Sequence, residues 1–422
     1  MIRTTLFLLI TLSFTVLSLA QEEESETASK QQNAFALQCY QTLAKASETE
    51  NIIFSPLGID ESLAILQLGA AGTTKDELTS LIGQRKTPPT VKTDKGKKEK
   101  DALSMQSILA VKKDLPIQKA FLETFTNWKN AQLCRMDFQD RDSAAKSLSS
   151  DMNENLRSLF LDIFQELDLK ETSAAVVNTV SFSCPWSMPF EEENTRVAPF
   201  NCFGGKTENV PFMYGKVFVA IKKFGDGTTS IELRLAQEEN WNYSMVIILP
   251  PNNAKAPAIL KGDIKPEQLA AWTSFDVFQE GDENSESEES DESHEEKEIK
   301  LYLPKFYVRQ DYDLKPHIQS LGAKTMFTKS AADFSALTTE QKLYVSDVRH
   351  SSFIDVDEKG VEAGAVTVAL VAAAGISKPE TVRVNRPFLF LIRNTESNEI
   401  LFMGRVLKPQ QKETAMEKTG ST

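Results

Sequence analysis

The chain has few of the residues on which catalytic and metal sites depend. Its 422 residues include only three histidines and four cysteines. His294, His317 and His350 lie far apart, and there is no Gly-x-Ser-x-Gly turn, phosphate-binding glycine loop or metal-ligand pair. A catalytic triad assembles in space, so counting residues does not exclude one. The lack of any local signature still favours binding or inhibition over catalysis, and predicts no enzyme, no metal and no cofactor.

Positive charge is also scarce. The 47 Lys and Arg are outnumbered by 60 Asp and Glu, which gives a net charge of -13. A general nucleic-acid binder needs a basic face, so this composition argues against that class. The hydrophobic fraction of 41% and the charged fraction of 25% suit a globular protein with a large core.

Long apolar runs are limited to one, at the N-terminus. It extends from Leu6 to Leu19, follows Arg3, and ends at the small residues Ser18 and Ala20. This pattern predicts a signal peptide over residues 1–20, cleaved after Ala20, and hence a secreted, extracellular protein. A membrane anchor is the weaker interpretation because the run is short and polar residues follow it.

The cysteines are spaced like neither a zinc site nor a redox motif. A Cys184–Cys202 disulfide and buried free thiols at Cys39, Cys134, Cys184 and Cys202 both remain open. The sequon Asn242-Tyr243-Ser244 predicts glycosylation of Asn242 in the secretory pathway.

Hydrophobic periodicity predicts helices and strands in no regular alternation. The expected helices cover residues 33–46 and 57–69, and the expected strands cover residues 51–54, 245–249, 301–308 and 384–392. An irregular mixture favours an α+β architecture over a doubly wound one. No repeat or linker divides the chain, so residues 21–422 are expected to form a single domain.

The segment after Glu358 is unusual. From Val361 to Ile376 it has no proline, one charge (Glu362), and mostly small or β-branched side chains. A buried central strand is the simple interpretation. If exposed, such a segment would add to any available sheet. One face of the extended chain carries only small or β-branched residues, and Glu362 points the other way, so the segment could lie outside a sheet in one state and inside it in another.

Here the sequence resembles the serpin family. Glu358-Lys359-Gly360 and the alanine-rich run after it look like the mobile hinge of inhibitory serpins. The resemblance covers nearly the whole mature chain, in the family's order. The matching stretches are Asn51 to Pro56, Gly69 to Thr74, Val177-Asn178, Phe182 through Trp186 to Phe190, Leu303 to Phe306, Tyr312 to Leu314, Val384 to Phe390, and Leu401 to Val406.

The resemblance implies a serpin fold of three β-sheets (A, B and C) with about nine helices and an exposed reactive-centre loop over residues 358–380. It implies a monomeric inhibitor that forms a covalent acyl complex with a target serine protease, after which the cut loop inserts into sheet A. It assigns the hinge to Glu358, Gly360, Val361, Ala363, Ala365 and Thr367. Small side chains there would keep insertion fast.

Family spacing places the reactive bond between Ala374 and Gly375, to within two residues. A small residue at the cut suits the shallow pocket of elastase-like proteases, and a chymotrypsin-like target is also considered. Two alternatives stay open: a non-inhibitory serpin acting as carrier, chaperone or storage protein, and an inhibitor of papain-like cysteine proteases.

The resemblance also assigns two structural clusters. Ser55, Asn178 and His350 match the shutter beneath the opening strands of sheet A. Trp186, Lys305 and Glu358 match the breach at the top of that sheet. Gly58 stands where the family often has serine, which predicts a thinner shutter.

Two charged insertions complete the pattern. Residues 85–100 lie near the helix where some serpins bind heparin, and predict binding of a heparin-like polyanion or glycosaminoglycan. The basic residues are Arg85, Lys86, Lys92, Lys95, Lys97, Lys98 and Lys100. A solvated loop is the favoured alternative. Residues 280–298 are almost entirely acidic residues and serine, which favours a disordered spacer over a binding or phosphorylated segment.

Overall fold

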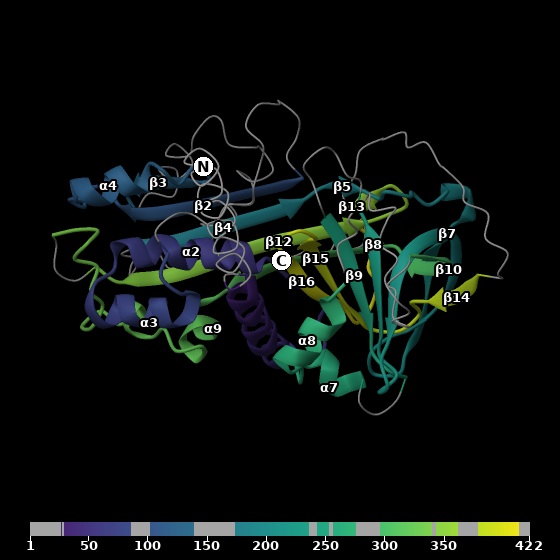
Figure 1. Ribbon diagram of the computed structural model, residues 1–422. Helices are drawn as coiled ribbons and strands as arrows, with labels where there is room; N and C mark the ends of the chain where they lie inside the picture. The colour runs from purple at the N-terminus through teal and green to yellow at the C-terminus, as the bar shows by residue number, and fades with distance from the viewer. Residues whose placement is uncertain are drawn as a thin grey trace, which may run out of the picture.

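The computed structural model describes residues 27, 29–85, 102–138, 174–235, 243–252, 256–275, 296–339, 343–361 and 379–412. Two β-sheets meet at the centre of the molecule, with helices packed below them (Figure 1). The predicted signal peptide, most of the basic and acidic insertions, and residues 362–378 of the loop lie outside the described residues. None of the helices within these ranges is long and apolar enough to cross a bilayer.

Seven α-helices occur in the described part of the chain. The first covers residues 29–46, close to the expected 33–46. The others are α2 (Pro56–Gly69), α3 (Gly72–Ile82), α4 (Lys119–Phe125), α7 (Ala256–Leu260), α8 (Pro266–Thr273) and α9 (Lys315–Ser320). Two 3-10 turns, η1 (Glu192–Asn194) and η2 (Thr325–Phe327), are added to these.

The seven-stranded sheet carries the region of interest. Its order is β3 (Ala131–Met136), β2 (Leu103–Lys112), β4 (Ala174–Phe182), β12 (Val345–Val356), β13 (Gly360–Val361) and β5 (Cys184–Pro185), with β11 (Phe306–Asp313) also paired to β12. The neighbours β4 and β12 run parallel, with Asn178 opposite His350. We refer to the line between these two strands as the β4–β12 seam.

The nine-stranded sheet contains β1 (Ile52–Phe54), β16 (Ile400–Val406), β15 (Phe388–Asn394), β9 (Tyr243–Leu249), β8 (Thr229–Arg234), β7 (Thr207–Lys223), β10 (Lys297–Pro304), β14 (Glu380–Arg383) and β6 (Arg196–Asn201). The 17-residue strand β7 pairs with β6 and β10 through its first part and with β8 through its last residues. The described strands therefore form two hydrogen-bonded assemblies, and β7 joins the two halves of the larger one.

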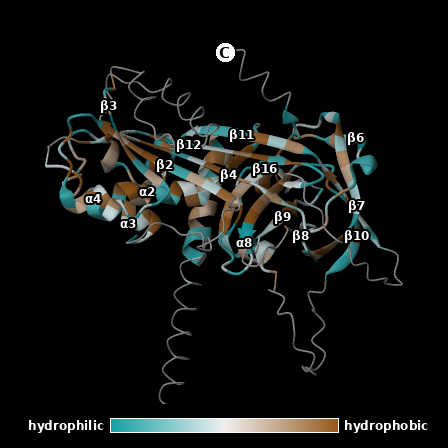
Figure 2. Ribbon diagram, turned by 90° about the horizontal axis from the view of Figure 1, so that it is seen from above, coloured by the Kyte–Doolittle hydropathy of each residue, from teal (hydrophilic) through white to brown (hydrophobic). Residues whose placement is uncertain are grey.

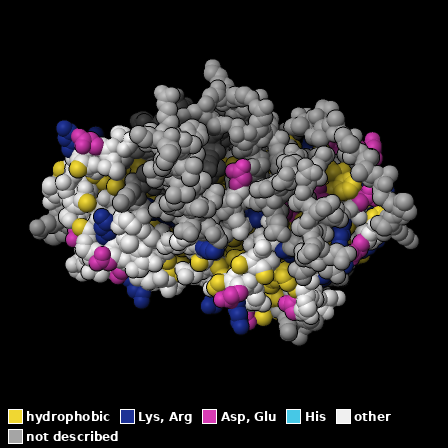
Figure 3. Space-filling model, viewed as in Figure 1, with side chains coloured by type: hydrophobic (Ala, Val, Ile, Leu, Met, Phe, Trp, Pro, Cys, Tyr) yellow, Lys and Arg dark blue, Asp and Glu magenta, His cyan; other side chains and the backbone are white. Residues whose placement is uncertain are grey.

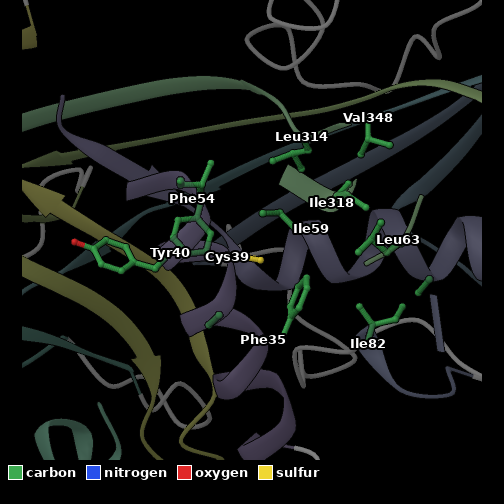
Figure 4. Close-up of a cluster of buried hydrophobic side chains, with 14 of the residues drawn as sticks. Phe35, Cys39, Tyr40, Phe54, Ile59, Leu63, Ile82, Leu314, Ile318 and Val348 are labelled. Carbon is green, nitrogen blue, oxygen red and sulfur yellow. The ribbon is translucent and has the colours of Figure 1, made fainter. Parts of the chain in front are cut away.

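Helix α2 supports the seam from below. Ser55 caps its N-terminus by accepting a hydrogen bond from the Gly58 N–H at 3.2 Å, and Pro56 begins the first turn. Nearly every residue of α2 is buried, so it is a central helix rather than an amphipathic surface helix. Figure 4 shows its Ile59 and Leu63 packed near Phe35 of the first helix and Ile318 of α9. Figure 2 shows hydrophobic residues concentrated where α2 passes under the strands. On the surface, Figure 3 shows side chains of both charges interspersed over one face.

Two expected strands differ from the observed ones. The run 301–308 is divided at Lys305, where the chain changes its pairing partner from β7 to β12. The Lys305 N–H still donates to the Pro211 carbonyl of β7 at 2.9 Å, but Pro211 has no N–H to return a bond, so β10 ends at Pro304 and β11 begins at Phe306. The run 384–392 forms a strand only from Phe388, directly after Pro387. The break at Lys305 places this lysine at a corner between the two sheets.

The four cysteines are buried, and no disulfide joins them. Burial raises the pKa of the Cys134 thiol to about 12, so this thiol stays protonated at neutral pH. The Cys184–Cys202 disulfide that the sequence left open is therefore absent from this structure.

Candidate functional site

The start of the expected loop lies inside the seven-stranded sheet. After β12 the chain turns sharply, with the Asp357 N–H donating to the Gly360 carbonyl at 3.0 Å. Val361 then pairs with Val356 of β12 on one side and with Cys184 of β5 on the other. Gly360 and Val361 are buried, and Val361 is 0% exposed. The first hinge residues therefore already occupy the upper end of the seam.

Trp186 fastens this turn to the sheet. Its indole N–H donates to the Asp357 carbonyl at 2.9 Å, and its backbone N–H donates to the Lys359 carbonyl at 3.0 Å. The ring is 1% exposed and packs edge-on against Phe190 at 6.2 Å between centroids. The predicted position of Trp186 beside Glu358 agrees with this geometry.

Glu358 lies between two donors. Lys305 Nζ is 2.6 Å from Glu358 Oε2, and the Thr195 hydroxyl donates to Glu358 Oε1 at 2.6 Å. Burial alone would raise the pKa of Glu358, but the hydrogen bonds from Lys305 and Thr195 outweigh it and lower the pKa below 4.5. Sequence reasoning named Lys305 but missed Thr195, for which the sequence carries no distinguishing signal.

We expect Lys305→Met to destabilise the native protein by about 1–3 kcal/mol at pH 7, because it leaves a buried carboxylate with one donor. Since the pKa of Glu358 is lowered in the fold, its contribution is present above pH 4.5 and is lost as the pH falls through the folded value. The difference between wild type and variant should therefore narrow in acid. Thermal unfolding between pH 3 and 8 measures both effects.

Lys359→Met is the matched control. Lys359 pairs with Glu192 at 3.5 Å, but both side chains are at least half exposed, so its loss should change stability little. Equal effects of the two variants would contradict the role given to Lys305.

The predicted shutter residues are brought together lower in the seam. The Ser55 N–H donates to His350 Nε2 at 3.0 Å, and His350 Nδ1 lies 2.9 Å from Asn178 Oδ1. All three residues are 0% exposed. Burial lowers the pKa of His350 to about 3, so the imidazole is neutral. Asn178 and His350 are the register partners of β4 and β12, so their hydrogen bond ties the two strands together.

Two further residues extend the shutter, and the sequence analysis missed them. Asn178 Nδ2 donates to Ser107 Oγ at 2.8 Å, and the Ser107 hydroxyl donates to Glu61 Oε2. Glu61 is 0% exposed, and burial raises its pKa to about 7 although the bond from Ser107 lowers it. The signal that could have revealed this pair is the presence of two adjacent acidic residues, Asp60 and Glu61, in a mostly apolar helix.

The position of the Asn178 side chain explains why residue 58 is a glycine. A Cβ on Gly58 would lie 2.2 Å from Asn178 Oδ1 and 2.5 Å from Val180 Cγ2. The close approach of α2 to β4 therefore requires glycine here. Gly58 supplies no hydroxyl to the shutter, as the sequence predicted. On the other side of Asn178, Ser107 and Glu61 add hydrogen bonds.

Several predicted residues lie outside the described parts of the chain. These are Ala363, Ala365, Thr367, Ala374, Gly375, Asn242, Lys86, Lys92, Lys95, Lys97, Lys98 and Lys100. Arg85 is described, and its guanidinium binds Asp60 in a fork, with Nη2 2.7 Å from Oδ2 and Nε 3.3 Å from Oδ1. No group of residues in the described ranges has the arrangement of a metal site.

Several known proteins are similar to this chain in both sequence and fold. Human alpha-1-antichymotrypsin is 30% identical over 393 residues, which cover 89% of this chain and 87% of that protein. Rat neuroserpin is 28% identical over 400 residues, covering 90% and 92%. Native protease nexin-1 with heparin superposes with a TM-score of 0.71 at 26% identity, covering 91% of this chain and 100% of that one. A thyroxine-binding globulin complex with thyroxine, at 22% identity and a TM-score of 0.71, has the same fold.

A family model described as serpin (serine protease inhibitor) matches residues 30–409, which include the hinge, the seam and both clusters. The expected α+β serpin fold is thus confirmed by the family match and by the structural neighbours. This chain belongs to the serpin family.

Proposed function

We propose that this serpin is a secreted inhibitor of an elastase-like or chymotrypsin-like serine protease. The observation that carries the proposal is the position of Gly360 and Val361 between β12 and β5. A loop whose first residues pair with β12 on one side and with β5, which follows β4 in the chain, on the other is placed to continue as a new strand between β4 and β12. A relative named alpha-1-antichymotrypsin supports the same class of target.

The proposed reaction begins at the Ala374 carbonyl. The protease serine Oγ attacks its carbon, the bond to Gly375 nitrogen breaks, and the amine leaves with the proton taken from the serine. An ester then joins Ala374 to the protease. As the freed loop inserts, the Asn178–His350 hydrogen bond must break, because an inserted strand separates β4 from β12. Insertion before hydrolysis of the ester leaves the protease trapped.

The test is incubation of the purified protein with elastase and, separately, with chymotrypsin. We expect a band at the summed mass on a denaturing gel, and a released peptide that begins at Gly375. An Ala374→Arg variant is the control, because it should transfer complex formation to a trypsin-like protease. Cleavage at this bond by every protease without a covalent band would contradict inhibition.

A carrier role is the second candidate. Its support is the fold shared with thyroxine-binding globulin, whose structure holds thyroxine. A carrier would be cut as a substrate without trapping the protease, so the same gel separates the two. A papain-like cysteine protease added in parallel tests the cross-class alternative.

Secretion, glycosylation and polyanion binding belong to the same proposal. The relatives that support an extracellular role are antichymotrypsin and neuroserpin, and protease nexin-1 was solved with heparin. Arg85 is already compensated by Asp60, so polyanion binding by residues 85–100 would rest on the six lysines. We propose that the protein acts as a monomer whose asparagine at position 242 carries glycan.

A further inference from the structure

The hydrogen bonds of the shutter have a fixed direction. The Ser55 backbone N–H can only donate, so His350 Nε2 must accept, and the neutral imidazole carries its proton on Nδ1. Nδ1 then donates to Asn178 Oδ1, which turns the Asn178 amide nitrogen toward Ser107. Ser107 accepts from this nitrogen, so its own hydroxyl proton requires another acceptor.

Glu61 is that acceptor, and it is the last member of this chain of hydrogen bonds. The Ser107 hydroxyl donates to Glu61 Oε2, while Glu61 Oε1 is buried without a hydrogen-bond partner in the described part of the protein. Every donor from Ser55 onward thus points toward one carboxyl group. The charged side chain beside it, Asp60, is held by Arg85 and takes no part in the chain.

We propose that Glu61 is a positioning residue for sheet opening: as the final acceptor, it fixes the orientation of Ser107 and Asn178 and so strengthens the Asn178–His350 bond across the β4–β12 seam. Without this acceptor the Ser107 hydroxyl would compete for Asn178 Oδ1 or remain unpaired. The seam would then open more readily. The inference rests on the proposed function, in which a strand enters this seam.

The test measures opening without any protease. A synthetic peptide with the sequence of residues 361–374 is added to the full-length protein, and its rate of insertion is followed by native gel. We expect Ser107→Ala and Glu61→Leu each to accelerate peptide insertion by about fivefold or more. Glu61→Gln should stay within about twofold of wild type, because its amide oxygen still accepts from Ser107.

Ser62→Ala is the matched control. Ser62 is equally buried in α2, but its hydroxyl donates to the Gly58 carbonyl of its own helix at 2.9 Å and does not reach the seam. Its loss should leave the insertion rate unchanged. If Ser62→Ala accelerates insertion as much as Ser107→Ala, general loosening of α2 explains the result and the proposal fails.

A double variant supplies the sharper criterion. Ser107 and Glu61 act through one hydrogen bond, so Ser107→Ala with Glu61→Leu should insert peptide no more than about twofold faster than either single variant. If the double variant accelerates peptide insertion by the product of the two single accelerations, the proposal is overturned. A Glu61→Gln variant that inserts peptide as fast as Glu61→Leu would overturn it too. If peptide inserts at the expected rates but no covalent protease complex forms, the proposed inhibitory function fails and the role of Glu61 stands.

Discussion

Replacing Val361 by aspartate should convert the protein from an inhibitor into a substrate. Val361 is 0% exposed between β12 and β5, opposite Val356 and Cys184, within a cluster of buried hydrophobic side chains. An unpaired buried charge costs several kcal/mol, so the aspartate should withdraw from the sheet in the native protein and would have to be buried again during insertion. Insertion competes with hydrolysis of the acyl-enzyme, so a barrier raised by only about 1.4 kcal/mol shifts that competition tenfold.

The measurement is the stoichiometry of inhibition together with the amount of cleaved protein. For Val361→Asp we expect at least about tenfold less covalent complex per protease, with cleavage at the reactive bond unchanged. Val361→Thr is the matched control, because it keeps the branched shape and adds only a neutral hydroxyl. An aspartate variant that traps protease as efficiently as wild type would contradict the expectation that burial of a charge at position 361 limits insertion.

Removal of the His350 imidazole should be the most damaging change to the seam. His350→Ala leaves the Ser55 N–H and Asn178 Oδ1 buried without partners, at about 1–3 kcal/mol each, and adds a cavity. We expect the melting temperature to fall by roughly 5–10 °C. His317→Ala is the control: this half-buried residue contacts the Thr42 hydroxyl at 3.2 Å, and its loss should lower the melting temperature far less.

The effect of the His350→Ala variant on the melting temperature should also depend on pH. Burial lowers the pKa of His350 from its ordinary 6.5 to about 3. Between these values the unfolded chain binds a proton at this residue that the native protein does not, so this source of stability is present above pH 6.5 and declines as the pH falls. The difference in melting temperature between wild type and His350→Ala should therefore shrink from pH 7 to pH 4.5. A difference that stays constant with pH would contradict a buried neutral histidine.

Much of the site was predictable because it lies in short, ordered motifs. Five of the residues stand in stretches that resemble the family, and His350 was assigned by its position; the five are Ser55, Asn178, Trp186, Lys305 and Glu358. The structure brings all six together in the two expected clusters. The strand expected over 301–308 is divided at Lys305, where the pairing passes from β7 to β12, because the apolar pattern carries no signal of such a change of partner. Ser107 and Thr195 were missed because a lone hydroxyl residue has no local signature.

The sequence by itself determined the fold class, the order of the elements and the family, since alternation, turn residues and motif order are local properties of the chain. Only the tertiary structure decided that Val361 is already inside the sheet, that Cys184 and Cys202 are not bonded, and that Glu61 ends the shutter chain. Ser107 and Glu61 are 46 residues apart, and they meet only because α2 packs against the strands β2 and β4. Such contacts depend on packing between elements distant in sequence, which no local pattern encodes.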